Sequence, residues 1–129
     1  MIQIFLLTAI VSLLDSIFLF LTQKYLPSLY GSVIPPESMI SLVYVFASWF
    51  SIGMAIYFLI VSRSDFSLIT ILKTAPVLGL AIYGIYTLAN YSLNPEKWSL
   101  KLVGIDIVRG VIILTLSTVI FSFFRKLYK

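Results

Sequence analysis

The chain has no cysteine and no histidine among its 129 residues. The lack of these two residue types excludes disulfide bonds, thiol nucleophiles, zinc sites of the usual Cys/His kind, His-ligated haem and an imidazole base. A glycine-rich phosphate loop is also missing, because the six glycines are scattered one or two to a segment. We therefore expect no metal and no cofactor.

Charge is scarce as well. Charged residues make up 11% of the chain and hydrophobic residues 60%, and the mean hydropathy is +1.08. A soluble domain carries about a quarter charged residues, so the composition predicts a membrane protein. One transmembrane helix takes about 20 residues, and a chain of this length therefore has room for four spans and for no soluble domain beside them.

Four continuous apolar runs are separated by clusters of proline, glycine, serine and charge. They lie at about 2–22, 39–61, 74–92 and 101–124. Each run is long enough to span a bilayer as a helix, whereas a transmembrane barrel would show alternating segments of about ten residues. The first run has no basic leader and contains Asp15, so we interpret it as a retained helix. The prediction is an all-α, four-helix bundle forming one transmembrane domain, with both termini on the same side.

The positions of lysine and arginine indicate the orientation, because loops on the cytoplasmic side carry an excess of these residues. The side that holds the termini would carry Arg63, Lys73, Arg125, Lys126 and Lys129, and the other side Lys24, Lys97 and Lys101. We expect both termini to be cytoplasmic, or on the equivalent side of an internal membrane of a virion or organelle. The bilayer is the expected partner. Nucleic acid is not, because the basic residues form no clustered face.

Small and polar residues recur at helical spacing in each run, which places them on one face of each helix. They are Thr8, Ser12, Asp15 and Thr22 in the first run, Ser41, Tyr44, Ser48, Ser51 and Ala55 in the second, Ala75, Gly79, Tyr83, Tyr86 and Asn90 in the third, and Asp106, Gly110, Ile113 and Ser117 in the fourth. Lipid tails cannot satisfy hydroxyl or amide groups, so we expect these stripes to face one another and to hydrogen-bond across helices.

Two further packing predictions follow from these stripes. Gly79, Gly84 and Gly110 would let neighbouring helices approach closely. The bulky side chains of the second run that lie off its stripe would instead face lipid or a partner subunit. These side chains are Phe46, Trp49 and Phe50.

Three charges lie inside the predicted spans, where an ionisable group costs on the order of 3 kcal/mol and is a functional hypothesis by default. At 1.5 Å per residue, Asp15 and Asp106 both lie roughly 8–10 Å below the same membrane surface. Arg109, three residues after Asp106, can pair within its own helix or reach across to Asp15. We predict one polar cluster in the outer half of the bundle, made of Asp15, Tyr44, Tyr83, Tyr86, Asn90, Asp106 and Arg109.

Three segments, LLDSIFL (13–19), VLGLAIYGIYTLANYSL (77–93) and KWSLKLVGIDIVRG (97–110), together resemble a family of small four-helix membrane proteins of unknown function. The family occurs in bacteria and in some large DNA viruses. The shared pattern is an acid in the first helix, a Gly-Tyr segment that ends in Asn, and a Trp followed by Asp-x-x-x-Gly. The matching residues here are Asp15, Gly79, Tyr83, Gly84, Tyr86, Asn90, Trp98, Asp106 and Gly110. The resemblance implies an aromatic residue at 109 and an acid at 87, where this chain has arginine and threonine. It implies a fold and a membrane location, and no activity.

Three functions remain open on this sequence. The first is a structural or interaction component of a membrane or membrane-containing assembly, with more copies of the chain or a larger assembly as partners. The second is a small oligomeric proton- or ion-coupled transporter, with Asp15 as the titrating carboxylate and Arg109 tuning it. The third is an intramembrane lipid-modifying enzyme that uses Asp15 and Asp106 as acid and base with Tyr83 or Tyr86 as donor.

Overall fold

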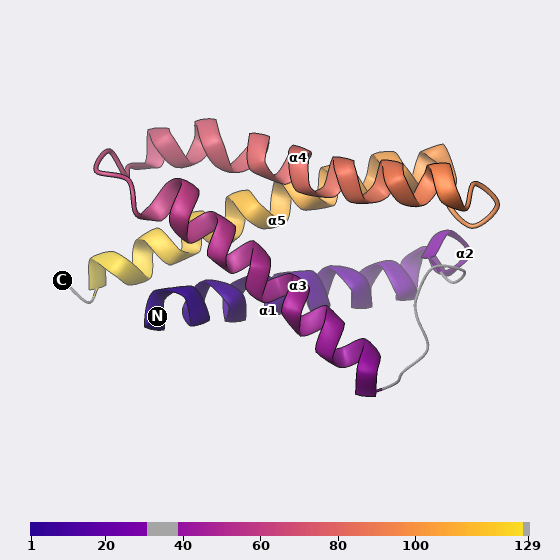
Figure 1. The fold of residues 1–129 in the computed structure, drawn as a ribbon, viewed down its shortest axis with the longest axis horizontal. Helices are drawn as coiled ribbons and strands as arrows, with labels where there is room; N and C mark the ends of the chain where they lie inside the picture. Colours follow the sequence, from indigo (N-terminus) through magenta and orange to yellow (C-terminus); the bar gives the residue numbers. More distant parts are fainter. Residues whose placement is uncertain (31–38, 128–129) are drawn as a thin grey trace.

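The computed structural model describes residues 1–30 and 39–127. Its elements are α1 (Ile2–Tyr25), the short α2 (Pro27–Tyr30), α3 (Met39–Ile56), the π-helical turn η1 (Tyr57–Val61), α4 (Leu68–Leu93) and α5 (Leu100–Leu127) (Figure 1). Within the described residues the fold is all-helical, and four of its helices are long and apolar enough to cross a membrane. The prediction of an all-α chain with four spans is confirmed.

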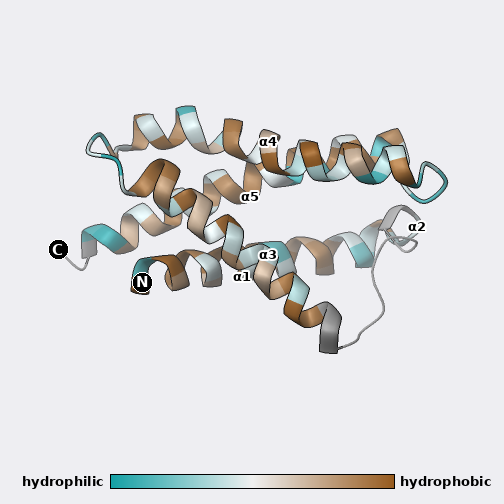
Figure 2. Cartoon of the chain, viewed as in Figure 1, coloured by the Kyte–Doolittle hydropathy of each residue, from teal (hydrophilic) through white to brown (hydrophobic). Residues whose placement is uncertain are grey.

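The bundle is built on two antiparallel neighbours, α4 and α5, which lie side by side along most of their length (Figure 1). Helix α1 packs against α5 and is crossed obliquely by α3, whose N-terminal end runs out from the other helices. Apolar residues cover the lengths of the helices, and hydrophilic ones gather in the turns and near the C-terminal end (Figure 2). This distribution is the one expected where lipid takes the place of water around the helices.

Helix α4 begins at Leu68, earlier than the position 74 that the apolar run predicted. Ser67 is its N-cap, and the Ser67 hydroxyl accepts a hydrogen bond from the Thr70 amide at 3.2 Å. Lys73 interrupts the apolar run in the sequence, yet it lies on the exposed side of α4 and does not end the helix. Pro76 consequently lies well inside α4.

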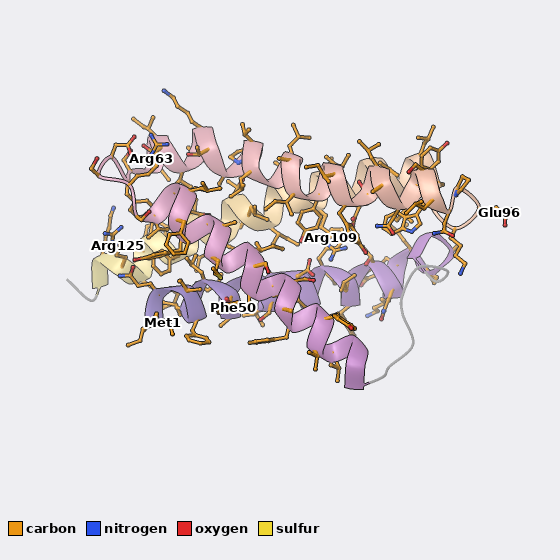
Figure 3. All side chains as sticks on the ribbon, in the orientation of Figure 1. Met1, Phe50, Arg63, Glu96, Arg109 and Arg125 are labelled. Carbon is orange, nitrogen blue, oxygen red and sulfur yellow. The ribbon has the colours of Figure 1, made fainter. Side chains whose placement is uncertain are left out.

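The turn between η1 and α4 is tied to the last turns of α5. Arg125 donates a hydrogen bond from Nη1 to the Val61 carbonyl oxygen at 3.1 Å, and its guanidinium lies 4.9 Å from the centre of the Phe66 ring. Within the turn, Arg63 donates to Asp65 at 2.9 Å, and this hydrogen bond lowers the pKa of the exposed Asp65 carboxyl below its ordinary value. Arg63, Arg125 and Met1 lie at the same end of the bundle (Figure 3).

Two glycines set the distance between α4 and α5. A Cβ atom at Gly79 would lie 2.6 Å from the carbonyl oxygen of Gly110, and one at Gly110 would lie 2.2 Å from Cγ of Tyr83. Gly84 makes no such contact, since a Cβ there would meet no atom within 4 Å. This corrects the expectation that all three glycines serve packing. Gly84 lies five residues after Gly79 and is rotated by about 140° around the helix, away from the line of contact.

The crossing of α1 and α3 depends on a glycine that the sequence analysis did not single out. A Cβ at Gly53 would lie 2.5 Å from Oγ1 of Thr8 and 3.3 Å from the Ile4 carbonyl oxygen. The contact face of α3 continues through the buried Ile52 and Ile56. The predicted stripe of α3 is therefore not its packing face: Ser48 and Ser51 are exposed in the chain, and the side chain of Ser41 lies outside the described residues.

Hydroxyl groups in the spans bond mainly to their own helices, which corrects the expectation of bonds across helices. Thr8 donates to the Ile4 carbonyl at 2.9 Å, Ser48 to Tyr44 at 2.9 Å, and Thr87 to Tyr83 at 2.8 Å. The carbonyl four residues earlier is always within reach of such a short side chain, so no neighbouring helix is needed to satisfy it. The bonds between helices come instead from the charged and aromatic residues.

Candidate functional site

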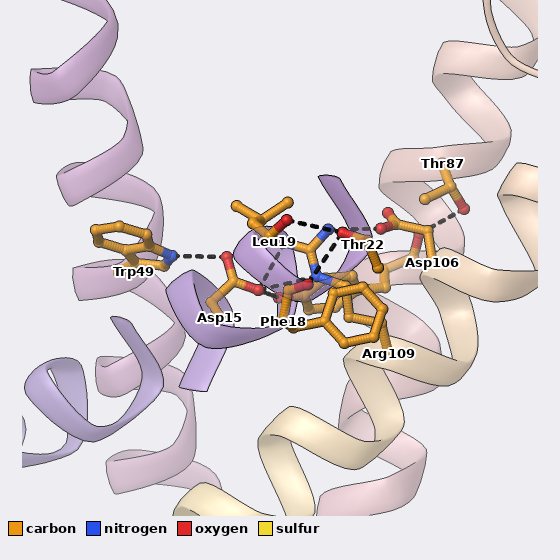
Figure 4. A network of polar contacts seen from close by, with 9 residues as sticks. Asp15, Phe18, Leu19, Thr22, Trp49, Thr87, Asp106 and Arg109 are labelled. Atoms are coloured by element: carbon orange, nitrogen blue, oxygen red, sulfur yellow. Dashed lines mark hydrogen bonds and ion pairs between the residues drawn. The ribbon is translucent and has the colours of Figure 1, made fainter. Parts of the chain in front are cut away.

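A single arginine joins two carboxylates in the interior of the bundle. Arg109 on α5 donates to Oδ1 of Asp15 on α1, from Nε at 2.9 Å and from Nη2 at 2.6 Å. It also donates from Nη1 to Oδ1 of Asp106 at 2.7 Å, one turn back on α5 (Figure 4). All three residues are at least nine-tenths buried within the chain. Arg109 thus makes both of the pairs that its spacing allowed, one within α5 and one across to α1.

Asp15 is the point at which all four spanning helices meet. Besides Arg109, it accepts a hydrogen bond at Oδ2 from the indole nitrogen of Trp49 on α3, at 3.0 Å. The Tyr83 hydroxyl on α4 lies 3.5 Å from Oδ1, at the limit of hydrogen-bonding distance. We call Asp15, Trp49, Tyr83, Asp106 and Arg109 the ion-pair network. Trp49 was expected to face lipid or a partner, and its bond to Asp15 shows that this expectation was wrong.

Aromatic rings enclose the guanidinium of Arg109. Its central carbon lies 5.2 Å from the centre of the Phe18 ring and 5.6 Å from that of Tyr83. Ring faces carry negative charge density and stabilise a cation inside apolar surroundings. The arginine is therefore held by carboxylates through its N–H groups and by aromatic rings nearby.

The remaining residues of the predicted cluster lie outside the ion-pair network. Tyr44 is 68% exposed on α3. Tyr86 is 57% exposed and packs edge-on against Trp98, with ring centres 5.9 Å apart. Asn90 donates to the Tyr86 carbonyl at 2.8 Å and so bonds to its own helix. Of the other two aromatic residues expected to face lipid or a partner, Phe46 is exposed and Phe50 packs against Phe5 of α1.

A cavity of about 590 Å³ adjoins the ion-pair network and is formed by all four spanning helices. Its volume is in the range of pockets that bind small molecules. The cavity reaches the surface of the chain at Ser48, Ser51 and Gln23, which are exposed. The lining comprises Asp15, Leu19, Gln23, Val45, Ser48, Trp49, Ser51, Ile52, Ile82, Tyr83, Tyr86, Trp98, Asp106 and Arg109.

The two tryptophans of this lining, Trp49 and Trp98, were not in the predicted polar cluster. Trp49 carried a signal, because a tryptophan in the middle of a span needs a partner for its indole N–H, whereas tryptophans usually lie at span ends. Trp98 matched the pattern of the resembling family and was given no place in the predicted polar cluster. It is buried and packs with Leu102 and Val103.

Comparison with known protein families agrees with this architecture. The family model described as "Predicted membrane protein (DUF2177)" matches residues 1–123. The chain belongs to this family. No curated protein and no solved structure matches it significantly. As a DUF2177 member with four spans, the chain is a membrane protein, and the resemblance inferred from its motifs is confirmed.

The chemistry open to this DUF2177 protein is that of a buried acid–base group beside a cavity. The ion-pair network contains two carboxylates and one guanidinium, so its formal charge is negative by one when all three are ionised. A buried excess charge is costly and is commonly neutralised by a proton or by a bound ion. Among the described residues, no group of three acidic side chains is placed to hold a metal ion.

Proposed function

We propose that this protein is a small membrane carrier that binds its cargo in the central cavity. The observation that carries the proposal is the position of the ion-pair network: its charged side chains are buried and also line a cavity of about 590 Å³. Buried charges inside a membrane domain are expensive, and those beside a cavity commonly mark the path of a substrate or ion.

The arrangement of α3 supports this proposal. The middle of α3 forms one wall of the cavity through Val45, Ser48 and Trp49, and the N-terminal end of α3 runs out from the other helices (Figure 1). At its other end, α3 continues into the π-helical turn η1. The change from α-helical to π-helical hydrogen bonding is a place at which a helix can bend. Movement of α3 about η1 would widen or narrow the cavity, with the bond from Trp49 to Asp15 as the contact that breaks.

A structural role is the second candidate, and one observation favours it. Asp15 accepts hydrogen bonds from side chains on three other helices. The ion-pair network can therefore hold the helices in fixed relative positions without binding a ligand. The enzyme alternative has less support, because Arg109 engages both carboxylates that would serve as acid and base.

Cysteine labelling distinguishes the carrier from the structural component, and the chain offers a clean background because it contains no cysteine. We expect a thiol at Ser48→Cys, in the cavity wall, to react with a charged methanethiosulfonate about tenfold faster than one at Phe46→Cys, since only a hydrated thiol forms the reactive thiolate. Both positions lie on α3 at similar depth, on opposite sides of the helix. Mass spectrometry of the reconstituted protein gives the two rates.

A rate at position 48 as slow as the rate at position 46 would mean that water and solutes do not enter the cavity. The carrier proposal would then fail and the structural role would stand. Introducing the same two cysteines together with Trp49→Phe tests the part assigned to α3. Loss of the bond to Asp15 should raise the rate at position 48 and leave the rate at position 46 unchanged.

We also propose that the end of the bundle near Met1 and Arg125 faces the cytoplasm, because lysine and arginine are more numerous at that end. Peptide tags at either terminus should then be protected from protease outside intact cells. A tag between α2 and α3 should be cleaved. Cleavage of only one of the two terminal tags would be incompatible with four spans.

A further inference from the structure

We infer that the cavity takes a monovalent organic cation with an apolar body, such as a lipophilic ammonium or phosphonium compound or the amine headgroup of a lipid. This inference rests on the proposed function, which supplies the cavity as a binding site, and it adds the chemical class of the ligand. Three features of the lining support it: the balance of charge, the aromatic rings and the apolar wall.

The charge balance favours a cation. The cavity lining contains Asp15 and Asp106 and one positive residue, Arg109. Arg109 donates three hydrogen bonds to these two carboxylates, so most of its N–H groups are already engaged when an anion approaches. An anion would also approach two carboxylates in surroundings of low dielectric constant, where repulsion between like charges is strong. A single positive charge on the ligand would bring the formal charge of the lining to zero.

The aromatic rings supply further contacts for a cation. Trp49, Tyr86 and Trp98 line the cavity from three different helices or turns. Tyr86 and Trp98 meet edge to face, with an interplanar angle of 84°. Recognition of ammonium groups by several ring faces is common in proteins and requires no hydrogen bond from the ligand. This suits quaternary ammonium and phosphonium ions, which have no N–H groups to donate.

Four further lining residues are apolar, and they favour an organic cation over a small inorganic one. They are Leu19, Val45, Ile52 and Ile82, whereas the polar Gln23, Ser48 and Ser51 lie where the cavity reaches the surface. A sodium ion needs several oxygen ligands in place of its water, so it gains nothing from the four aliphatic side chains. An organic cation instead buries its own apolar surface against them, which is favourable in proportion to the area removed from water.

Tryptophan fluorescence is a direct measure of occupancy, because the only two tryptophans of the chain, Trp49 and Trp98, both line the cavity. The probes are tetraphenylphosphonium and tetraphenylborate, which share shape and size and differ in the sign of their charge. The protein is held in maltoside micelles, which contain no amine. We expect tetraphenylphosphonium to change the emission saturably, and tetraphenylborate to give only the linear change that it also gives with free tryptophan in the same micelles.

Matched variants separate the contributions to binding. Asp106→Asn removes the excess negative charge and leaves the pair of Asp15 and Arg109, so it should weaken tetraphenylphosphonium binding about tenfold or more. Tyr86→Leu should weaken it about threefold to tenfold. Phe46→Leu, on the outside of α3, should bind as the unchanged chain does. Circular dichroism of each variant shows whether it is folded, and Tyr86→Leu tests the inference even where Asp106→Asn does not fold.

The outcomes distinguish this inference from the proposed function. Saturable binding of tetraphenylborate in place of tetraphenylphosphonium would overturn the cation and keep the binding cavity. Saturation by neither probe, with slow labelling at position 48, would overturn both. Competition by stearylamine added to the micelles would identify a lipid amine as the source of the cation, and binding of tetraphenylphosphonium undisturbed by stearylamine would identify a soluble one.

Discussion

Arg109→Leu is expected to lower the free energy of unfolding by about 3–5 kcal/mol, the usual cost of removing one partner from a buried ion pair. The substitution leaves Asp15 and Asp106 buried without the donor that joins them. Their remaining charge would have to be removed by protonation, or the helices would have to separate to admit water. Unfolding in mixed micelles of increasing dodecyl sulfate content, followed by circular dichroism, measures the loss.

A variant whose ion-pair network carries no charge provides the matched test of this prediction. The triple variant Asp15→Asn, Asp106→Asn and Arg109→Leu removes every charge, so it should regain most of the stability lost in Arg109→Leu. Arg63→Leu is the control for loss of an arginine, because its pair with Asp65 is exposed to solvent and should contribute little to stability. If Arg109→Leu unfolded no more easily than Arg63→Leu, the ion-pair network would contribute nothing to the fold.

Gly79→Ala is the second substitution with a large expected effect. Its methyl group would lie 2.6 Å from the Gly110 carbonyl oxygen and 2.8 Å from Cα of Val111, both of which belong to the backbone of α5. Backbone atoms inside a helix cannot rotate aside, so α4 and α5 must separate along their contact. We expect a loss of about 2–4 kcal/mol, somewhat above the typical cost of overpacking a core, because two helices move.

Gly84→Ala in the same helix is the control for Gly79→Ala. A Cβ at Gly84 meets no atom within 4 Å, so this substitution should be neutral or should stabilise the helix by up to about 1 kcal/mol through the better helix propensity of alanine. The same denaturation experiment compares the two variants. Equal stability of the two would show that the contact between α4 and α5 loosens at no cost.

Much of this architecture could be predicted because membrane helices are constrained by length and polarity. The four spans followed from continuous apolar runs, and the pairing of Arg109 with acids followed from the cost of an isolated charge in lipid. The first argument needs only a single helix. The second needs only opposite charges at similar depth in the membrane. The contact between Gly79 and Gly110 was likewise predictable from small residues at helical spacing.

The face of α3 and the place of Trp49 could not be predicted in this way. The serines of α3 suggested a packing face, but serine bonds to its own helix and does not require a protein neighbour. The crossing of α1 and α3 is instead set by the close contact between Gly53 and Thr8, and this contact depends on both helices. Once that contact sets the rotation of α3, Trp49 faces Asp15, and no periodicity within α3 alone specifies this result.

The bond between Asp15 and Arg109 joins residues 94 positions apart, so the first helix to be synthesised obtains its counter-ion from the last. A ribosome adds about 5–20 residues per second, and Asp15 therefore exists for roughly 5–20 seconds before Arg109 has been made. During that interval the nascent α1 must keep its carboxyl protonated or near the headgroups, because a lone carboxylate in lipid is costly. A chain that stops before α5 never acquires this arginine, so its Asp15 carboxyl keeps only the donors of Trp49 and Tyr83.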